Sequence, residues 1–389
     1  MRARIGVEEE FHVVDVESGL LVPRANAVLD RLPGERFTTE LKQSAVESNS
    51  EVHASLDTLY ADLVRSRSRL DGAASSQGLA VVAAGTVPLA RVESVDTTEN
   101  ARYGHMVDEY RLIADEQLIC GAQVHVDVPD RDTAVRAMCG VAPWLPTLLA
   151  LSASSPFWLG ADTGYASWRT MLWQRWPTAG PAGCFATAAE YDAAVGELVR
   201  SGVISDPGMV YYDVRPSSHQ QTLELRICDA CPRAETVVLV AGLFRALVLD
   251  ACDRPAEPGA CACQGRNEWL RAATWRAARS GLEGDLIHPA TRLAAPASQV
   301  VHALLRRLRP RLEENGDWET VSSLAEEALA AGSAAHRLRR AAREEDLLAC
   351  VDLLARETRG EHGPRRYAAP PGRRGATAGV TARVSPAQV

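Results

Sequence analysis

Lysine is nearly absent from this chain, since Lys42 is the only lysine among its 42 basic residues. A P-loop nucleotide site needs a lysine within the pattern GxxxxGK[ST], and Lys42 stands in the sequence ELKQ, so that kind of site is excluded. The chain also has no run of about eighteen apolar residues, which argues against a membrane-spanning helix. Its opening, MRARIGVEEEF, lacks the apolar core of a signal peptide. We therefore expect no membrane partner.

Cysteine is present but unevenly placed. Nine scattered cysteines, an odd number, favour a reducing compartment, the cytoplasm, over a disulfide framework. The pairs Cys228/Cys231 and Cys261/Cys263 leave a four-thiolate zinc site as an alternative, although the second spacing suits it poorly, and buried thiols are the simpler interpretation. A net charge of −8 opposes a nucleic-acid partner. The 46% of hydrophobic and 24% of charged residues are typical of a globular protein.

Hydrophobic periodicity predicts an α+β fold. Alternation of period two predicts strands at residues 4–15, 79–86, 119–128, 210–215 and 222–228, with a weaker one within 44–53. Apolar stripes of helical period predict helices at residues 55–76, 99–117, 131–154, 188–201, 236–252, 267–280, 298–314, 321–331 and 335–357. The strands are clustered rather than alternating with helices, and each has one apolar and one polar face. This favours a mostly antiparallel sheet with helices on its apolar face.

The polar strand faces carry the chemistry. They are predicted to gather Glu8, Glu10, Glu47, His125, Glu224 and Arg226, with Glu40 at the same mouth. Converging carboxylates repel unless cations lie between them, and such ligands suit Mg²⁺ or Mn²⁺. Arg215 and Arg226 could hold phosphate oxygens, so the set predicts phosphoryl transfer. Taken singly, each element also fits a solvated strand face, a structural histidine or a surface ion pair.

Several ordered blocks resemble one enzyme family. The segment GVEEEF at 6–11, the histidine strand at 119–130, the Trp-rich block at 149–176, the blocks at 214–217 and 223–230, and the late segment at 351–358 are similar to bacterial carboxylate–amine ligases, the type 2 glutamate–cysteine ligases. The resemblance covers residues 4–358 and implies a glutamine-synthetase-like curved, mostly antiparallel sheet. It also implies ATP and Mg²⁺, with Mn²⁺ as a substitute. The implied reaction is amide formation between glutamate and cysteine through a γ-glutamyl phosphate, and a ligase for another amine acceptor or another carboxylate is the alternative.

The resemblance also assigns roles to individual residues. It implies that the metal ligands are Glu8, Glu10, Glu40, Glu47 and Glu224. It implies that His125 lies near metal and phosphates, that Arg226 faces the transferred phosphoryl group, and that Arg215 and Arg169 hold nucleotide or substrate carboxylate. The chain departs from the family pattern at Val87, Gln123 and Asp127, and at Ala334, His336 and Leu338 in a late segment. These departures leave the amine acceptor open.

Two other functions share this sequence pattern: a guanidino-kinase-like phosphotransferase and a non-catalytic metabolite-binding relative. For the domain organisation, we expect one catalytic domain at residues 1–359 and a disordered basic tail at 360–389, because periodicity is lost from Gly360 onward. A homo-oligomer is compatible with the sequence.

Overall fold

One antiparallel sheet organises the molecule. The structure, a computed structural model, describes residues 3–253 and 266–362. Seven strands join in the order β2-β3-β1-β5-β9-β8, and β4 also pairs with β1. Their bounds are β1 (Ile5–Asp15), β2 (Phe37–Thr39), β3 (Ala45–Asn49), β4 (Leu79–Val82), β5 (Ala122–Asp127), β8 (Val214–Pro216) and β9 (Thr222–Leu225). Two small hairpins lie apart, β6 (Phe157–Trp158) with β7 (Ala161–Asp162), and β10 (Asp285–Ile287) with β11 (Ala294–Pro296). The expected α+β class and antiparallel sheet are confirmed.

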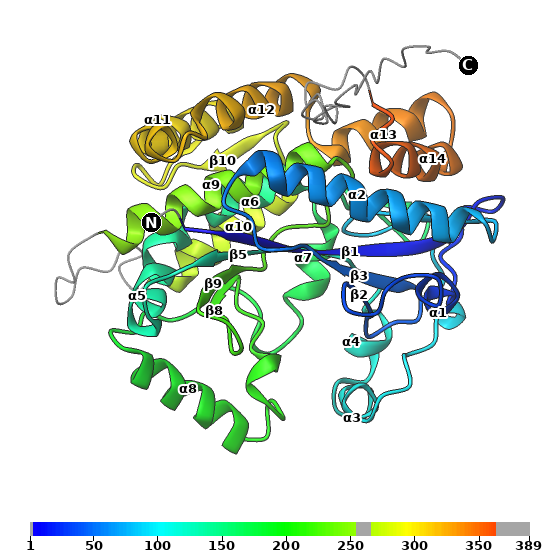
Figure 1. Cartoon of the computed structure of the whole chain (residues 1–389), viewed down its shortest axis with the longest axis horizontal. Helices are drawn as coiled ribbons and strands as arrows, with labels where there is room; N and C mark the ends of the chain where they lie inside the picture. Colours follow the sequence, from blue (N-terminus) through cyan, green and yellow to red (C-terminus); the bar gives the residue numbers. More distant parts are fainter. Residues whose placement is uncertain (1–2, 254–265, 363–389) are drawn as a thin grey trace, which may run out of the picture.

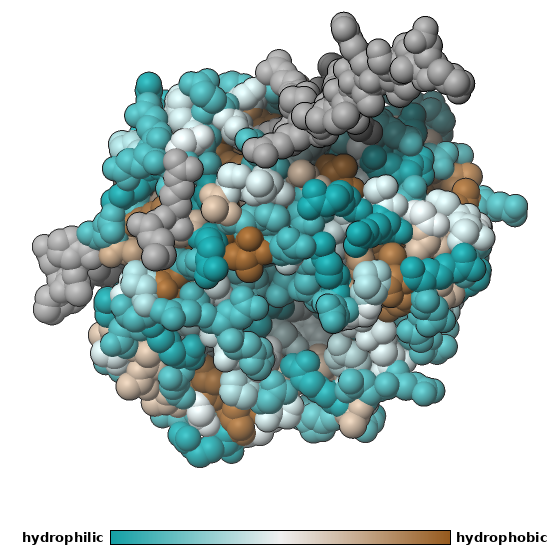
Figure 2. Space-filling model, viewed as in Figure 1, coloured by the Kyte–Doolittle hydropathy of each residue, from teal (hydrophilic) through white to brown (hydrophobic). Residues whose placement is uncertain are grey.

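Helices form a layer on one side of the sheet (Figure 1). That layer contains α2 (Leu56–Ser75), α9 (Ala234–Cys252), α11 (Ala297–Asn315) and α12 (Trp318–Ala331). The other helices are α1 (Ala25–Leu29), α3 (Ala101–Tyr110), α4 (Leu112–Asp115), α5 (Arg131–Val141), α6 (Leu145–Ser152), α7 (Trp168–Trp173), α8 (Ala188–Arg200), α10 (Asn267–Ser280), α13 (Ala334–Glu344) and α14 (Leu347–Thr358). The opposite side of the sheet is flanked by α8 and by α3 with α4, and the space-filling view is hollowed between these flanks (Figure 2).

The apolar face of the sheet and the helix layer share the main core. Ile5, Val7 and Val124 pack there with Leu59 of α2 and Leu243 of α9, and all five are at most 2% exposed. Burying such side chains contributes about 1.5–3 kcal/mol each relative to exposure. The alternation predicted for residues 4–15 and 119–128 is therefore what orients the sheet, because it leaves the polar residues on the opposite face.

Three predicted elements differ from the structure. The helix predicted at 99–117 is broken into α3 and α4 at Arg111, whose φ of 52° interrupts the helical backbone. The helix predicted at 335–357 is two helices, because Asp346 caps a new helix through the backbone N–H of Ala349. The strand predicted at 210–215 is paired only over β8.

One stretch, Arg131–Ser152, is long and apolar enough to span a membrane by composition. A 3-10 turn at Ala142–Trp144, which contains Pro143, separates its two helices, and 72% of its most apolar window is buried in the protein. It contains α5, which packs on α9, and α6, which packs on α10. This burial identifies it as a core element of the fold.

Two buried acids tie α2 to the sheet. Glu9 points into the helix layer, where Arg67 Nη2 donates to its Oε1 at 2.6 Å, and both side chains are at most 3% exposed. Asp62, fully buried, accepts from Arg36 Nη2 at 2.8 Å and from the backbone N–H of Glu51 at 2.8 Å. Burial alone would raise the pKa of Asp62, but these donors lower it to about 2. The acids of the GVEEEF segment thus have different roles, because Glu9 is buried under the helix layer whereas Glu8 and Glu10 lie on the polar face.

Candidate active site

A first carboxylate cluster comprises Glu10, Glu40 and Glu47. Glu10 and Glu47 stand directly opposite each other in the pairing of β1 with β3. One oxygen from each of the three lies within 4.8 Å of the others. Burial and the charges of Glu10 and Glu47 raise the pKa of Glu40 well above its ordinary value, and burial and the charge of Glu8 raise that of Glu47. Within the part of the chain that the structure describes, no arginine or lysine forms an ion pair with these three.

A second cluster comprises Glu8, His125 and Glu224, again with donor atoms within 4.8 Å. His125 Nε2 lies 3.1 Å from Glu8 Oε1, and its Nδ1 lies 3.0 Å from the hydroxyl of Thr222. His125 and Glu224 are cross-strand partners in the pairing of β5 with β9. Burial disfavours the imidazolium, but the neighbouring Glu8 and Glu224 outweigh it and raise the pKa of His125. The histidine can therefore hold a proton beside the carboxylates.

Two arginines flank Glu224. Arg215 Nε donates to Glu224 Oε2 at 2.8 Å, and Arg226 Nη1 pairs with Oε1 of the same carboxylate. Burial alone would raise the pKa of Glu224, but Arg226, Arg215 and His125 lower it to about 2. Glu224 therefore stays ionised and orients both guanidinium groups, and Nη1 of Arg215 also donates to the carbonyls of Gly208 at 3.0 Å and Val210 at 2.7 Å.

Arg169 and Trp173 form the support beneath Arg226. They lie four residues apart on α7, so both side chains share one face of that helix. The guanidinium carbons of Arg169 and Arg226 lie 5.5 and 5.9 Å from the ring centre of Trp173. Arg169 is 3% exposed and donates to the carbonyls of Ile227 at 3.3 Å and Arg226 at 3.4 Å. A Cβ on Gly121 would come within 2.4 Å of Arg169 Nη2, so the absence of a side chain there makes this packing feasible.

The structure thus brings all the predicted polar-face residues to one side of the sheet, with Arg169 at its base. Sequence reasoning missed three supporting residues. Thr222 precedes Glu224 by two residues and Arg226 by four, so the period-two pattern could have placed it on the same face. Gln123, which shares the polar strand face with His125 and was noted as a departure from the family, donates to Glu10 Oε1 at 2.7 Å. Trp173 could have been found from its i+4 spacing to Arg169.

The acidic groups fit divalent cations. Glu10, Glu40 and Glu47 offer oxygen donors and form no ion pair with a described arginine or lysine, and burial together with the charges of Glu10 and Glu47 raises the pKa of Glu40. Mg²⁺ prefers carboxylate oxygens and retains several waters, which suits a three-carboxylate wall. At the second cluster a cation would share Glu224 with the two arginines.

The cysteine pair proposed as half of a zinc site lies elsewhere. Cys228 and Cys231 are buried in the main core, and burial raises the pKa of Cys228 to about 12 and that of Cys231 well above its ordinary value. Both are therefore held as thiols in the core, while Cys261 and Cys263 lie outside the described residues. A thiolate pair would need deprotonation at a site that disfavours charge.

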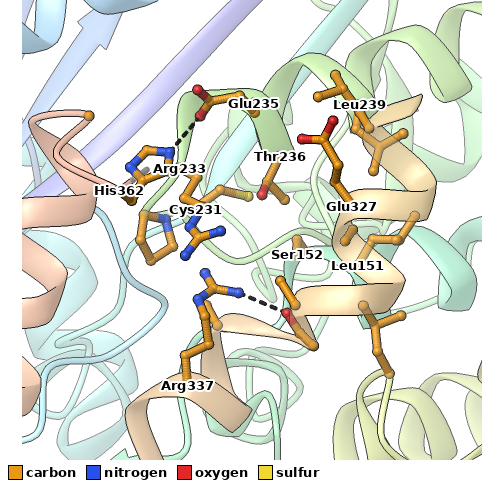
Figure 3. Close-up of a pocket in the computed structure, with 18 residues that line it drawn as sticks. Leu151, Ser152, Cys231, Arg233, Glu235, Thr236, Leu239, Glu327, Arg337 and His362 are labelled. Carbon is orange, nitrogen blue, oxygen red and sulfur yellow. Dashed lines mark hydrogen bonds and ion pairs between the residues drawn. The ribbon is translucent and has the colours of Figure 1, made fainter. Parts of the chain in front are cut away.

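A cavity of about 110 Å³ also opens within the helix layer, on the far side of the sheet (Figure 3). Arg233 and Arg337 reach its wall, and both pair with Glu357. His362 pairs with Glu235 at 3.1 Å. Glu357 of α14 (Leu347–Thr358) therefore joins α13 to the segment that leads into α9.

The fold and the polar face place this chain among known proteins. Two solved structures share the fold: a glutamate–cysteine ligase from Francisella tularensis in complex with AMP and a bifunctional glutathione synthetase from Pasteurella multocida. The first has a TM-score of 0.69 at 11% identity, covering 92% of this chain and 89% of that one. The second has a TM-score of 0.68 at 17% identity, covering 92% and 52%. The glutamine-synthetase-like, ligase-type sheet expected from the sequence is confirmed.

A family model described as glutamate-cysteine ligase family 2 matches residues 4–363, and the chain belongs to that family. It is 56% identical over 356 residues to a "Putative glutamate–cysteine ligase 2-2" of Frankia casuarinae, covering 91% of this chain and 41% of that protein. A protein of the same name from Mycolicibacterium smegmatis is 51% identical over 361 residues, covering 91% of this chain and 89% of that protein. The chain thus spans less than half of the Frankia relative and nearly all of the mycobacterial one.

Proposed function

We propose that this chain is an ATP-dependent carboxylate–amine ligase that joins glutamate to cysteine or to another amine. The observation that carries the proposal is the pair of carboxylate clusters facing Arg215 and Arg226 across one sheet face. Family membership supports it, because relatives carry the glutamate–cysteine ligase name. Negative clusters to hold cations and guanidinium groups to hold moving phosphate oxygens are the two requirements of phosphoryl transfer.

The chemistry follows from the weakness of a carboxylate as an acyl donor. A γ-carboxylate oxygen of glutamate attacks the γ-phosphorus of ATP, the bond to the β-phosphate oxygen breaks, and ADP leaves. The amine nitrogen then attacks the acyl carbon, inorganic phosphate leaves, and the amine loses a proton. Arg226, held by Glu224 and Trp173, is placed to stabilise charge on the transferred group. Arg215 is placed to hold a second anionic oxygen, and a protonated His125 a third.

We propose that Glu10, Glu40 and Glu47 hold one Mg²⁺ and that Glu8 and Glu224 approach a second, with His125 beside them as a hydrogen-bond donor. The ions, replaceable by Mn²⁺, would neutralise the triphosphate and draw electron density from the γ-phosphorus. The chain's own part is to fix the oxygen donors: Gly121 N–H and Gln123 Nε2 bind Glu10 at 2.6 and 2.7 Å, so its carboxylate is oriented before any ion arrives.

The test is mass spectrometry of products from the purified chain with ATP, Mg²⁺, glutamate and a panel of amines that includes cysteine. An amide product formed with ADP is expected. Glu8→Gln should abolish it while the protein stays folded, and Asp57→Asn, the same acid-to-amide change at an exposed residue at the start of α2, is the matched control. A phosphorylated nitrogen acceptor would establish the kinase alternative, and bound nucleotide without turnover would establish the metabolite-binding one.

We further propose that the described residues form one catalytic unit working on small-molecule substrates in the cytoplasm. The family match over 4–363 supports the single unit. The net charge of −8 and the scattered cysteines support a reducing compartment without a nucleic-acid partner. The predicted tail at 360–389 lies outside the described residues from position 363 onward. Gly360 and His362 still pack, since His362 reaches Glu235.

A further inference from the structure

A separate cavity of about 240 Å³ opens at one end of the polar face, where β1 begins and β5 ends. It is lined by Glu8 and His125 of the second cluster and by Arg4 and Asp127, which form an ion pair. It is smaller than the ~300–1,000 Å³ typical of sites for drug-sized ligands, so it suits a compact substrate. Asp127 is one of the positions at which the chain departs from its family pattern.

The Arg4–Asp127 ion pair that lines this cavity leaves hydrogen-bonding atoms on both side chains without a partner in the described part of the chain. Arg4 Nε lies 2.7 Å and the Arg4 backbone nitrogen 3.2 Å from the same oxygen, Oδ2 of Asp127. Among the described residues, Asp127 Oδ1 accepts no hydrogen bond and the two terminal nitrogens of Arg4 donate none. A carboxylate oxygen and a guanidinium edge, side by side and open to solvent, match the ammonium and the carboxylate of a zwitterionic amino acid.

The charge of the cavity argues against a phosphate ligand. Two carboxylates, Glu8 and Asp127, line the cavity beside one guanidinium, that of Arg4, and apart from His125 the other lining side chains are neutral. A polyanion would meet two carboxylates, whereas a zwitterion places its two charges against opposite partners. The nucleotide phosphates therefore belong to the arginine end of the face.

Distance along the strands decides which substrate fits. Asp127 pairs with Thr222, and His125 pairs with Glu224. Two residues of strand separate Asp127 from His125 by roughly 7 Å, and four separate Thr222 from Arg226 by roughly 13 Å. Glutamate is a few ångströms long between its α-carbon and γ-carboxylate. With its head group at Asp127, its γ-carboxylate would reach the region of Glu8 and His125, between the cavity and Arg226.

We propose that this cavity binds the α-amino acid head group of the carboxylate donor, glutamate, with Asp127 receiving the ammonium and Arg4 the carboxylate. The inference rests on the proposed ligase function and names the substrate subsite. The amine acceptor does not suit the position, because its reacting nitrogen must stay at the reaction centre and unpaired.

The experiment compares Asp127→Asn and Arg4→Gln in the full chain. Kinetics should show a rise of about ten- to a hundredfold in KM for glutamate, the effect of losing a charge-assisted hydrogen bond, with KM for ATP within about twofold. Calorimetric titration of glutamate, without turnover, should show the same loss of affinity. The matched control is Asp192→Asn, which breaks the similarly exposed Arg131–Asp192 pair on α5 and α8. It should change neither the KM nor the calorimetric affinity for glutamate.

Analogues test the recognition atom by atom. The wild type should reject glutarate, which lacks the ammonium, and Asp127→Asn should lose most of that discrimination. An unchanged KM and affinity for glutamate in both variants would overturn the subsite while the ligase stands. Absence of turnover with any amine, together with glutamate binding that still depends on Asp127, would overturn the ligase function and leave the subsite standing.

Discussion

Glu9→Gln should destabilise the protein far more than Glu8→Gln, although the two residues are neighbours in one acidic run. Glu9 faces the helix layer, where it pairs with Arg67 at 2.6 Å and both side chains are at most 3% exposed. Glutamine keeps the volume but removes the charge, leaving a buried guanidinium without its counter-ion. Glu8 lies on the polar face with a side chain 30% exposed.

The size of the stability loss in Glu9→Gln depends on the hydrogen bonds that Arg67 keeps. Breaking a buried ion pair by removing one charge costs about 3–5 kcal/mol. Arg67 also donates to the carbonyls of Cys231 at 2.8 Å and Pro232 at 2.6 Å, and these bonds survive the substitution. We therefore expect the lower end, about 3 kcal/mol in the free energy of unfolding, which is roughly a hundredfold in the equilibrium constant.

Urea unfolding followed by circular dichroism measures this difference. Glu8→Gln should stay within about 1 kcal/mol of the wild type but lose ATP turnover, whereas Glu9→Gln should shift the unfolding midpoint strongly. The double variant Glu9→Gln/Arg67→Met, which removes the orphaned charge, should recover part of the loss. Equal stability of Glu8→Gln and Glu9→Gln would refute the assignment of the two faces of β1.

Four further outcomes are expected. Gly121→Ala should cost about 1–3 kcal/mol in urea unfolding and lower kcat, because its Cβ would displace Arg169. Trp173→Leu should lower kcat about tenfold while Trp173→Phe keeps most of it, since the ring lies against the guanidinium of Arg226, and an equal loss in both would contradict this. Asp62→Asn should cost about 2 kcal/mol at neutral pH. Because the folded pKa is depressed from 3.8 to about 2, that difference is fully present above pH ~4 and disappears as pH falls toward ~2 in pH-dependent unfolding. Removal of residues 363–389 should leave the thermal midpoint unchanged, and a large drop in that midpoint would show that the tail supports the fold.

Local pattern accounts for much of the site. The period-two alternation around Glu8, His125 and Glu224 placed these residues on a polar face, because the apolar residues between them must be buried. The long apolar helices, such as α2 and α9, were predictable within a few residues for the same reason. The helix breaks at Arg111 and Asp346 were not predictable in this way, because the apolar pattern continues with helical period across both residues.

The sequence by itself determined which face of each strand is acidic, and through its family blocks the class of the fold. The tertiary structure decided which acids meet. Glu10 lies opposite Glu47 only because β1 and β3 adopt one register, and Glu40 joins them from the connection before β3. The pairing of Glu9 with Arg67 likewise depends on where α2 docks. Side-chain alternation is a property of neighbouring residues, whereas strand register and helix docking depend on contacts between distant segments, which one-dimensional periodicity does not encode.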